Sequence, residues 1–256
     1  MIPNFIDTHT HLYDEQFDDD RDAIINKALS LGVSKMYLPN CDSSTIGPMM
    51  QMAERWPQQC FPMMGVHPCY IKENYKEELA LAESWLSKAK FSAIGEIGLD
   101  YYWDTTFVPQ QKEAFNQQMD WALHLNLPIV IHTRESLQDG IDMVKAKQNG
   151  KLKGIFHCFG GTLQEAQQII DLGFYLGIGG VATFKKSTLP AVLEQVSLDH
   201  LVIETDAPYL APTPYRGKRN ESSYIPLIGE KIAAIKNCSV EEVAEITTRN
   251  AQIIFG

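Results

Sequence analysis

The sequence predicts a single domain, spanning residues 1–256, with the (β/α)8 barrel fold of the α/β class. Two observations support this prediction. Eight short runs of apolar, β-branched and aromatic residues recur along the chain, and stretches with helical periodicity lie between them. A (β/α)8 barrel typically needs ~250 residues, and this chain has 256 residues. An open, doubly wound sheet is the alternative fold for the same alternation.

Each apolar run is expected to form one strand of a parallel sheet, with a crossover helix leading to the next strand. In chain order, the predicted strands lie within residues 4–12, 35–40, 60–68, 91–100, 127–134, 152–161, 174–180 and 201–210. The clearest helices between them are predicted from apolar residues at helical spacing. They lie within residues 19–32, 107–126, 135–150 and 162–173.

A closing helix is predicted at the C-terminal end of the chain. Ser239 and Glu242 have the spacing of a capping box, which marks a helix start. The apolar residues Val243, Ile246 and Ile253 then recur at helical spacing and should form its buried face. We assign no chemistry to this helix.

The composition narrows the class of protein. A net charge of −10 argues against broad, non-specific binding to nucleic acid, but it allows a local basic patch or a cation-filled site. No apolar run approaches the length of a membrane span, and the N-terminus lacks the pattern of a secretory signal. The five cysteines are scattered, which predicts reduced thiols in a cytoplasmic protein.

Polar residues that can bind metals lie at the ends of five predicted strands. They are His9, His11, Glu96, His132, His157 and Asp206. In a barrel enzyme, the carboxyl ends of all strands face one mouth, where the active site lies. Buried imidazoles and carboxylates without partners are costly, and a metal ion supplies a partner. The set is too large for one tetrahedral ion and suits two divalent ions bridged by a carboxylate.

The first predicted strand also carries an acidic residue, Asp7, before the two histidines. Asp7, His9 and His11 stand two residues apart. On a β-strand, this spacing places all three side chains on the same face. We therefore expect Asp7 to leave the strand beside the two histidines.

Several motifs resemble those of the TatD family of metal-dependent deoxyribonucleases, within the amidohydrolase-like barrels. They are DTHTHL, GVHP, GEIGLDYY, IHTRES, FHCF and ETDAPYLAPTPYRGKRNE, and EEVAEITTRNA extends the likeness almost to the C-terminus. The family fold is a TIM-type barrel, in agreement with the strand pattern. Two positions depart from the family: Gly160 stands where serine is usual, and Ser222 where proline is usual.

The resemblance implies which residues bind metal. One divalent ion would be held by His9, His11 and Asp206, and a second by His132 and His157, with Glu96 bridging the two. Imidazole favours zinc, nickel or manganese, and carboxylates also accept magnesium. Asp206 and Glu96 are the expected catalytic residues, with Asp206 as general base toward the attacking water.

The resemblance also implies an activity, the hydrolysis of DNA phosphodiester bonds. The expected enzyme is a 3′-to-5′ exonuclease acting on single-stranded or frayed ends, with RNA left open as a further substrate. The same ligand set would serve an amidohydrolase-type enzyme that cleaves a small ester, lactone or phosphotriester. A barrel that only binds a metal or a partner is a third alternative.

Two residues near the predicted mouth are candidates for substrate binding. The resemblance makes His67 a substrate-side residue, and a capping role in a loop or helix is the alternative. Arg134 lies two residues beyond His132, so it should point to the same side and hold a phosphate, unless it pairs with Glu135 or Glu204. Glu204 itself is expected to orient a histidine ligand.

A basic cluster and a group of aromatic residues complete the predicted substrate site. The basic residues follow Asp206 in a proline-rich loop and could clamp phosphates or form an ordinary solvated loop; they are Arg216, Lys218 and Arg219. The aromatic residues follow the fourth predicted strand and could stack bases or pack over the barrel rim; they are Tyr101, Tyr102 and Trp103.

Overall fold

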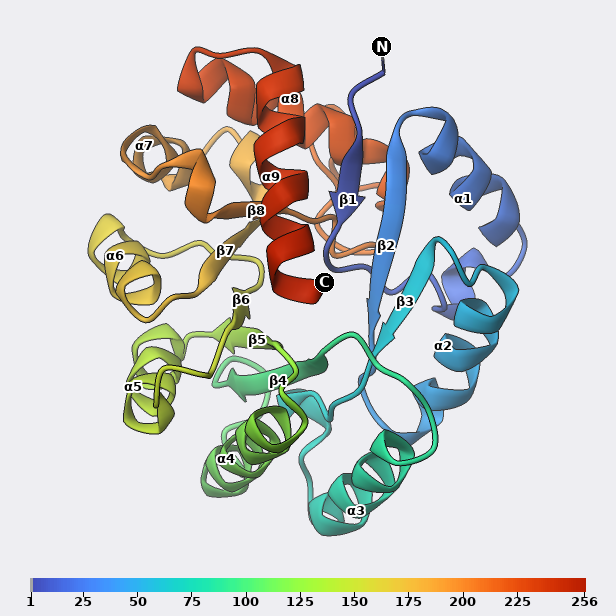
Figure 1. Ribbon diagram of the computed structural model, residues 1–256, viewed down its shortest axis with the longest axis vertical. Helices are drawn as coiled ribbons and strands as arrows, with labels where there is room; N and C mark the ends of the chain where they lie inside the picture. The colour runs from blue at the N-terminus through green and yellow to red at the C-terminus, as the bar shows by residue number, and fades with distance from the viewer. Residues whose placement is uncertain (1) are drawn as a thin grey trace.

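The computed structural model describes residues 2–256, and in this range eight parallel strands form a ring surrounded by helices (Figure 1). The strands are β1 (Phe5–Asp7), β2 (Val33–Pro39), β3 (Cys60–Met63), β4 (Ile94–Asp100), β5 (Ile129–Arg134), β6 (Gly154–Phe156), β7 (Tyr175–Ile178) and β8 (Leu201–Ile203). They pair in chain order, β1 to β3 in one hydrogen-bonded group and β4 to β8 in a second. Every predicted strand run therefore contains a strand.

Backbone contacts connect the two groups of strands into a barrel. The Thr8 N–H donates to the Ile203 carbonyl at 3.1 Å between β1 and β8. Met64 forms a parallel bridge with Ile94 between β3 and β4. An open, doubly wound sheet would leave edge strands and would not keep its strands in chain order. The alternative fold is therefore wrong, and the predicted barrel is confirmed.

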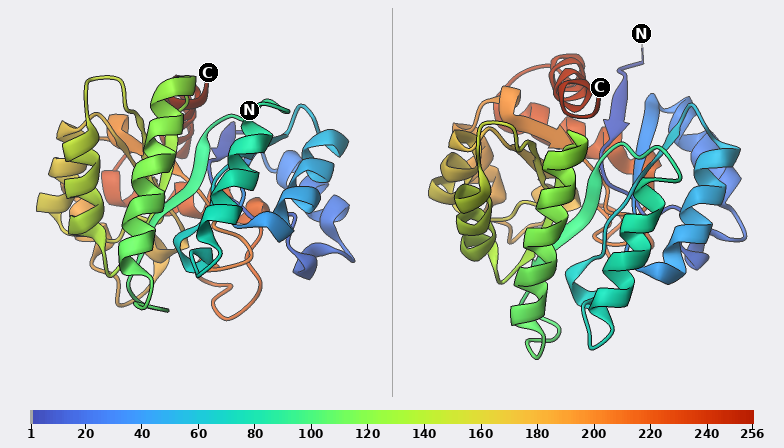
Figure 2. Two further views of the ribbon diagram at one scale, coloured as in Figure 1. Left: turned by 90° about the horizontal axis from the view of Figure 1, so that it is seen from below. Right: turned by 60° about the horizontal axis from the view of Figure 1, so that its bottom comes forward.

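The helices cover the outside of the ring (Figures 1 and 2). They are α1 (Arg21–Ser30), α2 (Ser43–Arg55), α3 (Tyr75–Leu86), α4 (Val108–Leu125), α5 (Leu137–Lys147), α6 (Leu163–Asp171), α7 (Leu189–Gln195), α8 (Ile225–Lys236) and α9 (Val240–Phe255). Short 3-10 turns lie at η1 (Glu15–Phe17), η2 (Pro68–Tyr70), η3 (Gly180–Thr183), η4 (Leu198–His200) and η5 (Ser222–Tyr224). One large apolar cluster fills the layer between strands and helices.

Helix α9 closes the amino end of the barrel, as Figure 1 shows. Ala251 and Ile254 of α9 pack with strand residues from inside the ring. Thr248 donates to the Asn4 carbonyl just before β1, at 2.8 Å. The predicted closing helix is confirmed, but Ile253 is wrongly placed in its buried face, since Ile253 is 58% exposed and Ile254 only 2%.

The loops at the carboxyl ends of the strands lie on the opposite side of the barrel from α9. In the left view of Figure 2, the loop between β8 and α8 (orange) projects from the lower edge, away from α9 and both termini. None of the helices in residues 2–256 combines the length and apolarity that a membrane crossing requires.

The packing of α9 predicts that truncation of two neighbouring isoleucines lowers the free energy of unfolding by different amounts. Ile254→Ala should lower the free energy of unfolding by about 2–3 kcal/mol, because it removes buried methylene groups and leaves a cavity at the barrel end. The matched control, Ile253→Ala, should change it by less than about 0.5 kcal/mol, since that side chain is exposed. Urea unfolding of both variants checks this, and equal losses would contradict it.

Candidate metal centre

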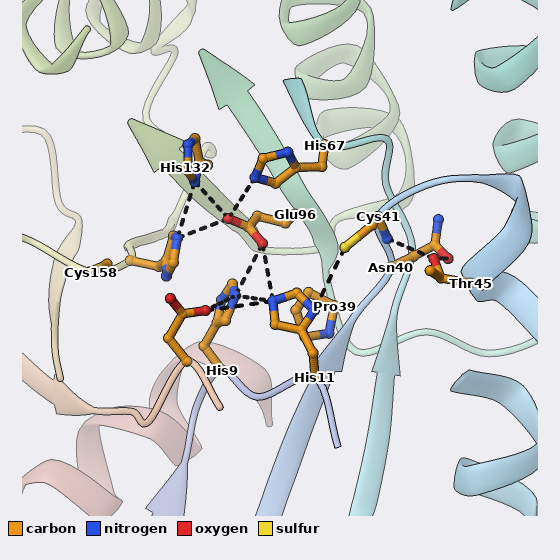
Figure 3. Close-up of polar contacts among 12 residues, drawn as sticks. His9, His11, Pro39, Asn40, Cys41, Thr45, His67, Glu96, His132 and Cys158 are labelled. Carbon is orange, nitrogen blue, oxygen red and sulfur yellow. Dashed lines mark hydrogen bonds and ion pairs between the residues drawn. The ribbon is translucent and has the colours of Figure 1, made fainter. Parts of the chain in front are cut away.

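Five imidazoles surround the carboxylate of Glu96 at the carboxyl end of the barrel (Figure 3). Glu96 lies on β4, where all seven residues are buried. Its Oε2 atom is 3.1 Å from His9 Nε2 and 3.6 Å from His11 Nε2. Its Oε1 atom is 2.8 Å from His157 Nε2, 2.9 Å from His132 Nδ1 and 3.4 Å from His67 Nε2. The two oxygens of one carboxylate thus face two separate groups of nitrogen atoms.

The first group contains His9, His11 and Asp206. The two Nε2 atoms of the histidines are 3.3 Å apart, and Asp206 Oδ1 lies 3.7 Å from His9 Nε2 and 3.6 Å from His11 Nε2. Donor atoms ~2.0–2.2 Å from one ion at tetrahedral angles are roughly 3.3–3.6 Å from each other. With Glu96 Oε2, these atoms have the chemistry and spacing of a divalent metal site.

The second group contains His132 and His157 on the other side of Glu96. His157 Nε2 and His132 Nδ1 are 3.4 Å apart, and both lie within 2.9 Å of Glu96 Oε1. The tertiary structure therefore brings all six predicted ligand residues into one cluster, although they come from distant parts of the chain. The donor types and their spacing fit metal ions in both groups.

His9 and His11 follow β1 and are not part of it, because the strand ends at Asp7. The His11 N–H donates to the Ala207 carbonyl at 2.7 Å, and the Asp206 N–H donates to the His9 carbonyl at 2.9 Å. These two hydrogen bonds align the histidine segment directly beside the segment that carries Asp206.

Asp7 does not share the direction of the two histidines, so that expectation is wrong. Its carboxylate accepts hydrogen bonds from Thr205 N at 2.9 Å, Thr205 Oγ1 at 2.6 Å and Ser222 Oγ at 2.6 Å. Burial raises the pKa of Asp7 to about 7, against the opposing effect of these hydrogen bonds. Asp7 therefore connects β1 to the segment before Asp206, and Ser222 supplies a donor that proline lacks. At the other departure from the family pattern, Gly160, a methyl group would meet open space.

Hydrogen bonds fix which nitrogen of His11 faces the centre. Its Nδ1 atom lies 2.8 Å from the Tyr13 hydroxyl, which itself donates to the Pro39 carbonyl. The hydroxyl must therefore accept a hydrogen bond from His11 Nδ1–H, so Nε2 is the nitrogen that faces the cluster and would bind an ion. No pattern in the sequence indicates this role of Tyr13.

Asp100 does the same for His132. Its Oδ2 atom is 2.8 Å from His132 Nε2, so Nδ1 is the nitrogen that faces Glu96 and the cluster, at 2.9 Å from Glu96 Oε1. Its Oδ1 atom accepts from the backbone N–H groups of Tyr102 and Trp103, both at 3.0 Å. Sequence reasoning did not assign this role to Asp100, although its position at the end of a ligand-bearing strand was a usable signal.

Glu204 lies behind His157 and is fully buried, with its Oε1 atom 3.3 Å from His157 Nδ1. The same oxygen accepts a hydrogen bond from the Cys158 N–H, and His157 Nδ1 has no hydrogen-bond partner within residues 2–256, so the orienting role of Glu204 stays a prediction. The second oxygen, Oε2, occupies space that only a glycine leaves open, since a methyl group on Gly177 would lie 2.2 Å from it. The buried His9 Nδ1 atom has no hydrogen-bond partner within residues 2–256.

His67 has the capping role considered for it, and its other ring nitrogen faces the centre. Its Nδ1 atom accepts from the Cys69 N–H at 3.1 Å and caps η2. Burial lowers the pKa of His67, so the neutral ring predominates, with its proton on Nε2. An Nε2–H group is a donor and not a metal ligand. It lies 3.4 Å from Glu96 Oε1 and faces the centre.

Burial and neighbouring charges shift the pKa values of the ionisable groups in opposite directions. Burial opposes ionisation of Glu96, but the surrounding imidazoles, His157 first, hold its pKa well below the usual range. Burial also opposes protonation of His157, but the carboxylates of Glu96 and Glu204 raise its pKa well above the usual value. A metal ion would displace this proton, so metal binding should release protons.

The predicted phosphate-binding residues have different surroundings. Arg134 forms neither ion pair considered for it, and its guanidinium stacks on Tyr102 at 3.7 Å from the ring centre. Arg216 stacks on Phe184 at 3.6 Å, and Lys218 forms no ion pair within residues 2–256. Arg219 instead pairs with Asp20 at 2.6 Å. The basic cluster therefore contains two exposed cations and one residue that binds the η1 region.

The chain matches a known protein family and known proteins over almost its full length. The sequence profile of the family described as TatD related DNase matches residues 6–256. The metal-dependent hydrolase YabD of Bacillus subtilis is 39% identical over 250 residues, covering 97% of this chain and 98% of that protein. The protein named 3′-5′ ssDNA/RNA exonuclease TatD of Erwinia tasmaniensis is 31% identical over 255 residues, covering 97% and 98%.

A solved structure agrees with the observed architecture. The crystal structure of YjjV, a TatD homologue from Escherichia coli, superposes with a TM-score of 0.93 at 26% sequence identity. The superposition covers 100% of this chain and 99% of that chain. The two chains therefore share their fold over the full length of both.

The hydrogen bond from His132 to Asp100 predicts a defect in metal binding. Asp100→Asn should weaken the binding of Zn²⁺ by about 10–100-fold, because His132 loses the carboxylate that fixes its orientation. Asp104→Asn is the control on the same loop, since Asp104 pairs with Lys72 and not with a ligand. Titration calorimetry of metal-free protein measures both affinities. Equal affinities in the two variants would contradict the assigned role of Asp100.

Proposed function

The chain belongs to the TatD family of metal-dependent hydrolases, and on this basis we propose that it cleaves phosphodiester bonds of single-stranded DNA from a free end. The observation that carries the proposal is the position of Glu96, whose two oxygens face separate groups of donor atoms. A carboxylate with this arrangement can bridge two divalent ions, as in two-metal phosphodiester hydrolysis.

The proposed ligand set follows the two groups. His9, His11 and Asp206 would hold one ion. His132 and His157 would hold the other, and Glu96, which contacts both groups, would serve both ions. When bound, such ions lower the pKa of water and neutralise charge on phosphoryl oxygens. Mixed imidazole and carboxylate donors suit zinc, nickel, manganese or magnesium.

Asp206 is well placed to act as the general base. Its side chain is 15% exposed, whereas those of His9 and Glu96 are 0% and 3% exposed. Asp206 thus lies on the solvent-exposed side of the cluster. Burial opposes its ionisation, but a hydrogen bond from His11 and the charge of His157 lower its pKa, so it remains a carboxylate that can accept a proton from the attacking water.

His67 and Arg134 would contact the substrate phosphate. His67 directs its Nε2–H toward the centre, where it can donate to a phosphoryl oxygen. The Arg134 side chain makes no hydrogen bond or ion pair within residues 2–256, so its N–H groups are available. Hydrogen bonds from these donors would strengthen as negative charge develops on the phosphoryl oxygens, and this would accelerate the reaction.

The location of the cluster favours a strand end as substrate. His9 and Glu96 are buried by 98% or more, so the reacting phosphate must enter the barrel mouth. A single-stranded end is slim enough to enter, whereas a duplex must first fray and a continuous strand must bend sharply. The name of the Erwinia relative supports a 3′ end and leaves RNA as a further substrate.

Removal of metal should abolish the activity. Chelated protein, verified free of metal, should not cleave a labelled oligonucleotide until a divalent ion is restored. Glu96→Gln should reduce turnover far more than Glu204→Gln, because only Glu96 faces both donor groups. Turnover by metal-free protein, or a normal rate for Glu96→Gln with two ions bound, would show that the proposal is wrong.

The two exposed cations of the basic cluster should contribute to DNA affinity. Arg216→Ala with Lys218→Ala should flatten the salt dependence of single-strand binding by about 1.4 units of slope, or ~0.7 for each lost phosphate contact. Arg219→Ala, the control, should leave the slope unchanged because Arg219 pairs with Asp20. Filter binding at several salt concentrations measures the slopes, and identical slopes would make the cluster an ordinary solvated loop.

The decisive experiment compares circular and linear single-stranded DNA of one sequence, with enzyme and metal held constant. The linear strand should be degraded from its end with release of mononucleotides, while the circle should persist. Equal loss of both would rule out dependence on an end. A lactone and a phosphotriester belong in the same panel, and faster turnover of either would favour the amidohydrolase-type alternative.

A further inference from the structure

Four exposed aromatic side chains surround the metal centre. Within residues 2–256, nine large hydrophobic residues are strongly exposed, and the aromatic ones are Tyr70 at 44%, Tyr102 at 50%, Trp103 at 67% and Tyr209 at 52%. Each of them follows a segment that carries a residue of the cluster. The other five are aliphatic. Exposed aromatic rings in this range are therefore confined to the mouth of the barrel.

Trp103 and Tyr102 form one platform with Arg134. Trp103 and Tyr102 contact edge to face, with ring centres 4.9 Å apart. The Arg134 guanidinium lies 3.7 Å from the centre of the Tyr102 ring and 5.2 Å from that of Trp103. Arg134 covers one face of Tyr102, and Trp103 stands at 85° to the Tyr102 ring and is 67% exposed, so the Trp103 ring leaves surface open on which a nucleobase can stack.

The platform is held at a fixed position relative to the metal centre. Asp100 accepts hydrogen bonds from the backbone N–H groups of both Tyr102 and Trp103, and its other oxygen contacts His132. One buried carboxylate thus connects the loop backbone to a proposed metal ligand. Rigid support of this kind lowers the entropy cost of ordering a bound base.

Tyr209 lies on the opposite side of the mouth. It follows β8, whereas Tyr102 and Trp103 follow β4, and these strands are four places apart in a ring of eight that pairs in chain order. The ring centre of Tyr209 is 6.2 Å from that of His11. The proposed metal ligands therefore lie between one aromatic platform and a second aromatic ring.

We propose that Trp103 with Tyr102 and Arg134 stacks one unpaired base, and that Tyr209 stacks another, on opposite sides of the bond to be cleaved. This inference rests on the proposed nuclease function and names the feature of the substrate that the site recognises. Stacking uses the face of a base and not its hydrogen-bonding edge, so recognition tolerates any sequence. Paired bases in a duplex are already stacked and cannot insert between these rings.

The test measures binding to a cleavage-resistant phosphorothioate oligothymidylate, with metal present. Trp103→Ala and Tyr209→Ala should each weaken binding by roughly five- to a hundredfold. Leu81→Ala, which removes an exposed side chain on α3, is the control and should bind normally. The bound strand should also quench the fluorescence of wild-type protein, and Trp103→Phe should lose most of this signal.

An abasic strand with the same backbone separates stacking from phosphate binding. It should bind the wild-type protein weakly, and Trp103→Ala and Tyr209→Ala should bind it as well as wild type does. This result also shows that the variants are folded. If wild-type protein binds and cleaves oligothymidylate but both variants bind it normally, the stacking inference is wrong and the nuclease proposal stands. If wild-type protein neither binds nor cleaves any strand, the nuclease proposal itself fails.

Discussion

The buried carboxylate of Glu96, with imidazoles around both of its oxygens, is the interaction on which the site depends. Removal of such a group from water is costly unless charge and hydrogen-bonding partners replace the lost solvation. Here the partners come from the ends of β1, β3, β5 and β6, so the full barrel is needed to assemble them. The closed ring of strands and the chemistry of the centre are therefore linked, because an open sheet would separate these strand ends.

A layer of hydrogen bonds outside the cluster sets the direction of its lone pairs. Tyr13 and Asp100 each accept a hydrogen bond from one histidine, and Glu204 lies behind a third. Asp7 holds the first strand to the segment that carries Asp206. Such groups do not bind the ion themselves, yet they fix the tautomer and orientation that binding needs. Preorganisation of the centre thus depends on residues that hydrophobic or charge patterns do not identify.

The proposed binding site for a nucleic-acid strand lies on an acidic protein. The net charge of −10 disfavours general attraction to nucleic acid. At the mouth, however, Arg134 lies beside exposed aromatic rings, and the loop after Asp206 carries Arg216 and Lys218, which form no ion pair within residues 2–256. A site of this composition would gain affinity from stacking as well as from charge, which suits a strand with unpaired bases.

The sequence by itself determined the barrel and the six residues of the cluster. Strands and helices each place apolar residues at a characteristic spacing, so their alternation can be read along the chain. In a barrel the carboxyl ends of all strands lie on one face, so polar residues at those ends must lie close together. The sequence could not determine that Asp7 turns toward Thr205, that Tyr13 orients His11, or that Arg219 pairs with Asp20. Only the tertiary structure decided these points, because each depends on a contact between residues whose spacing in the chain follows no period, and such contacts arise from packing.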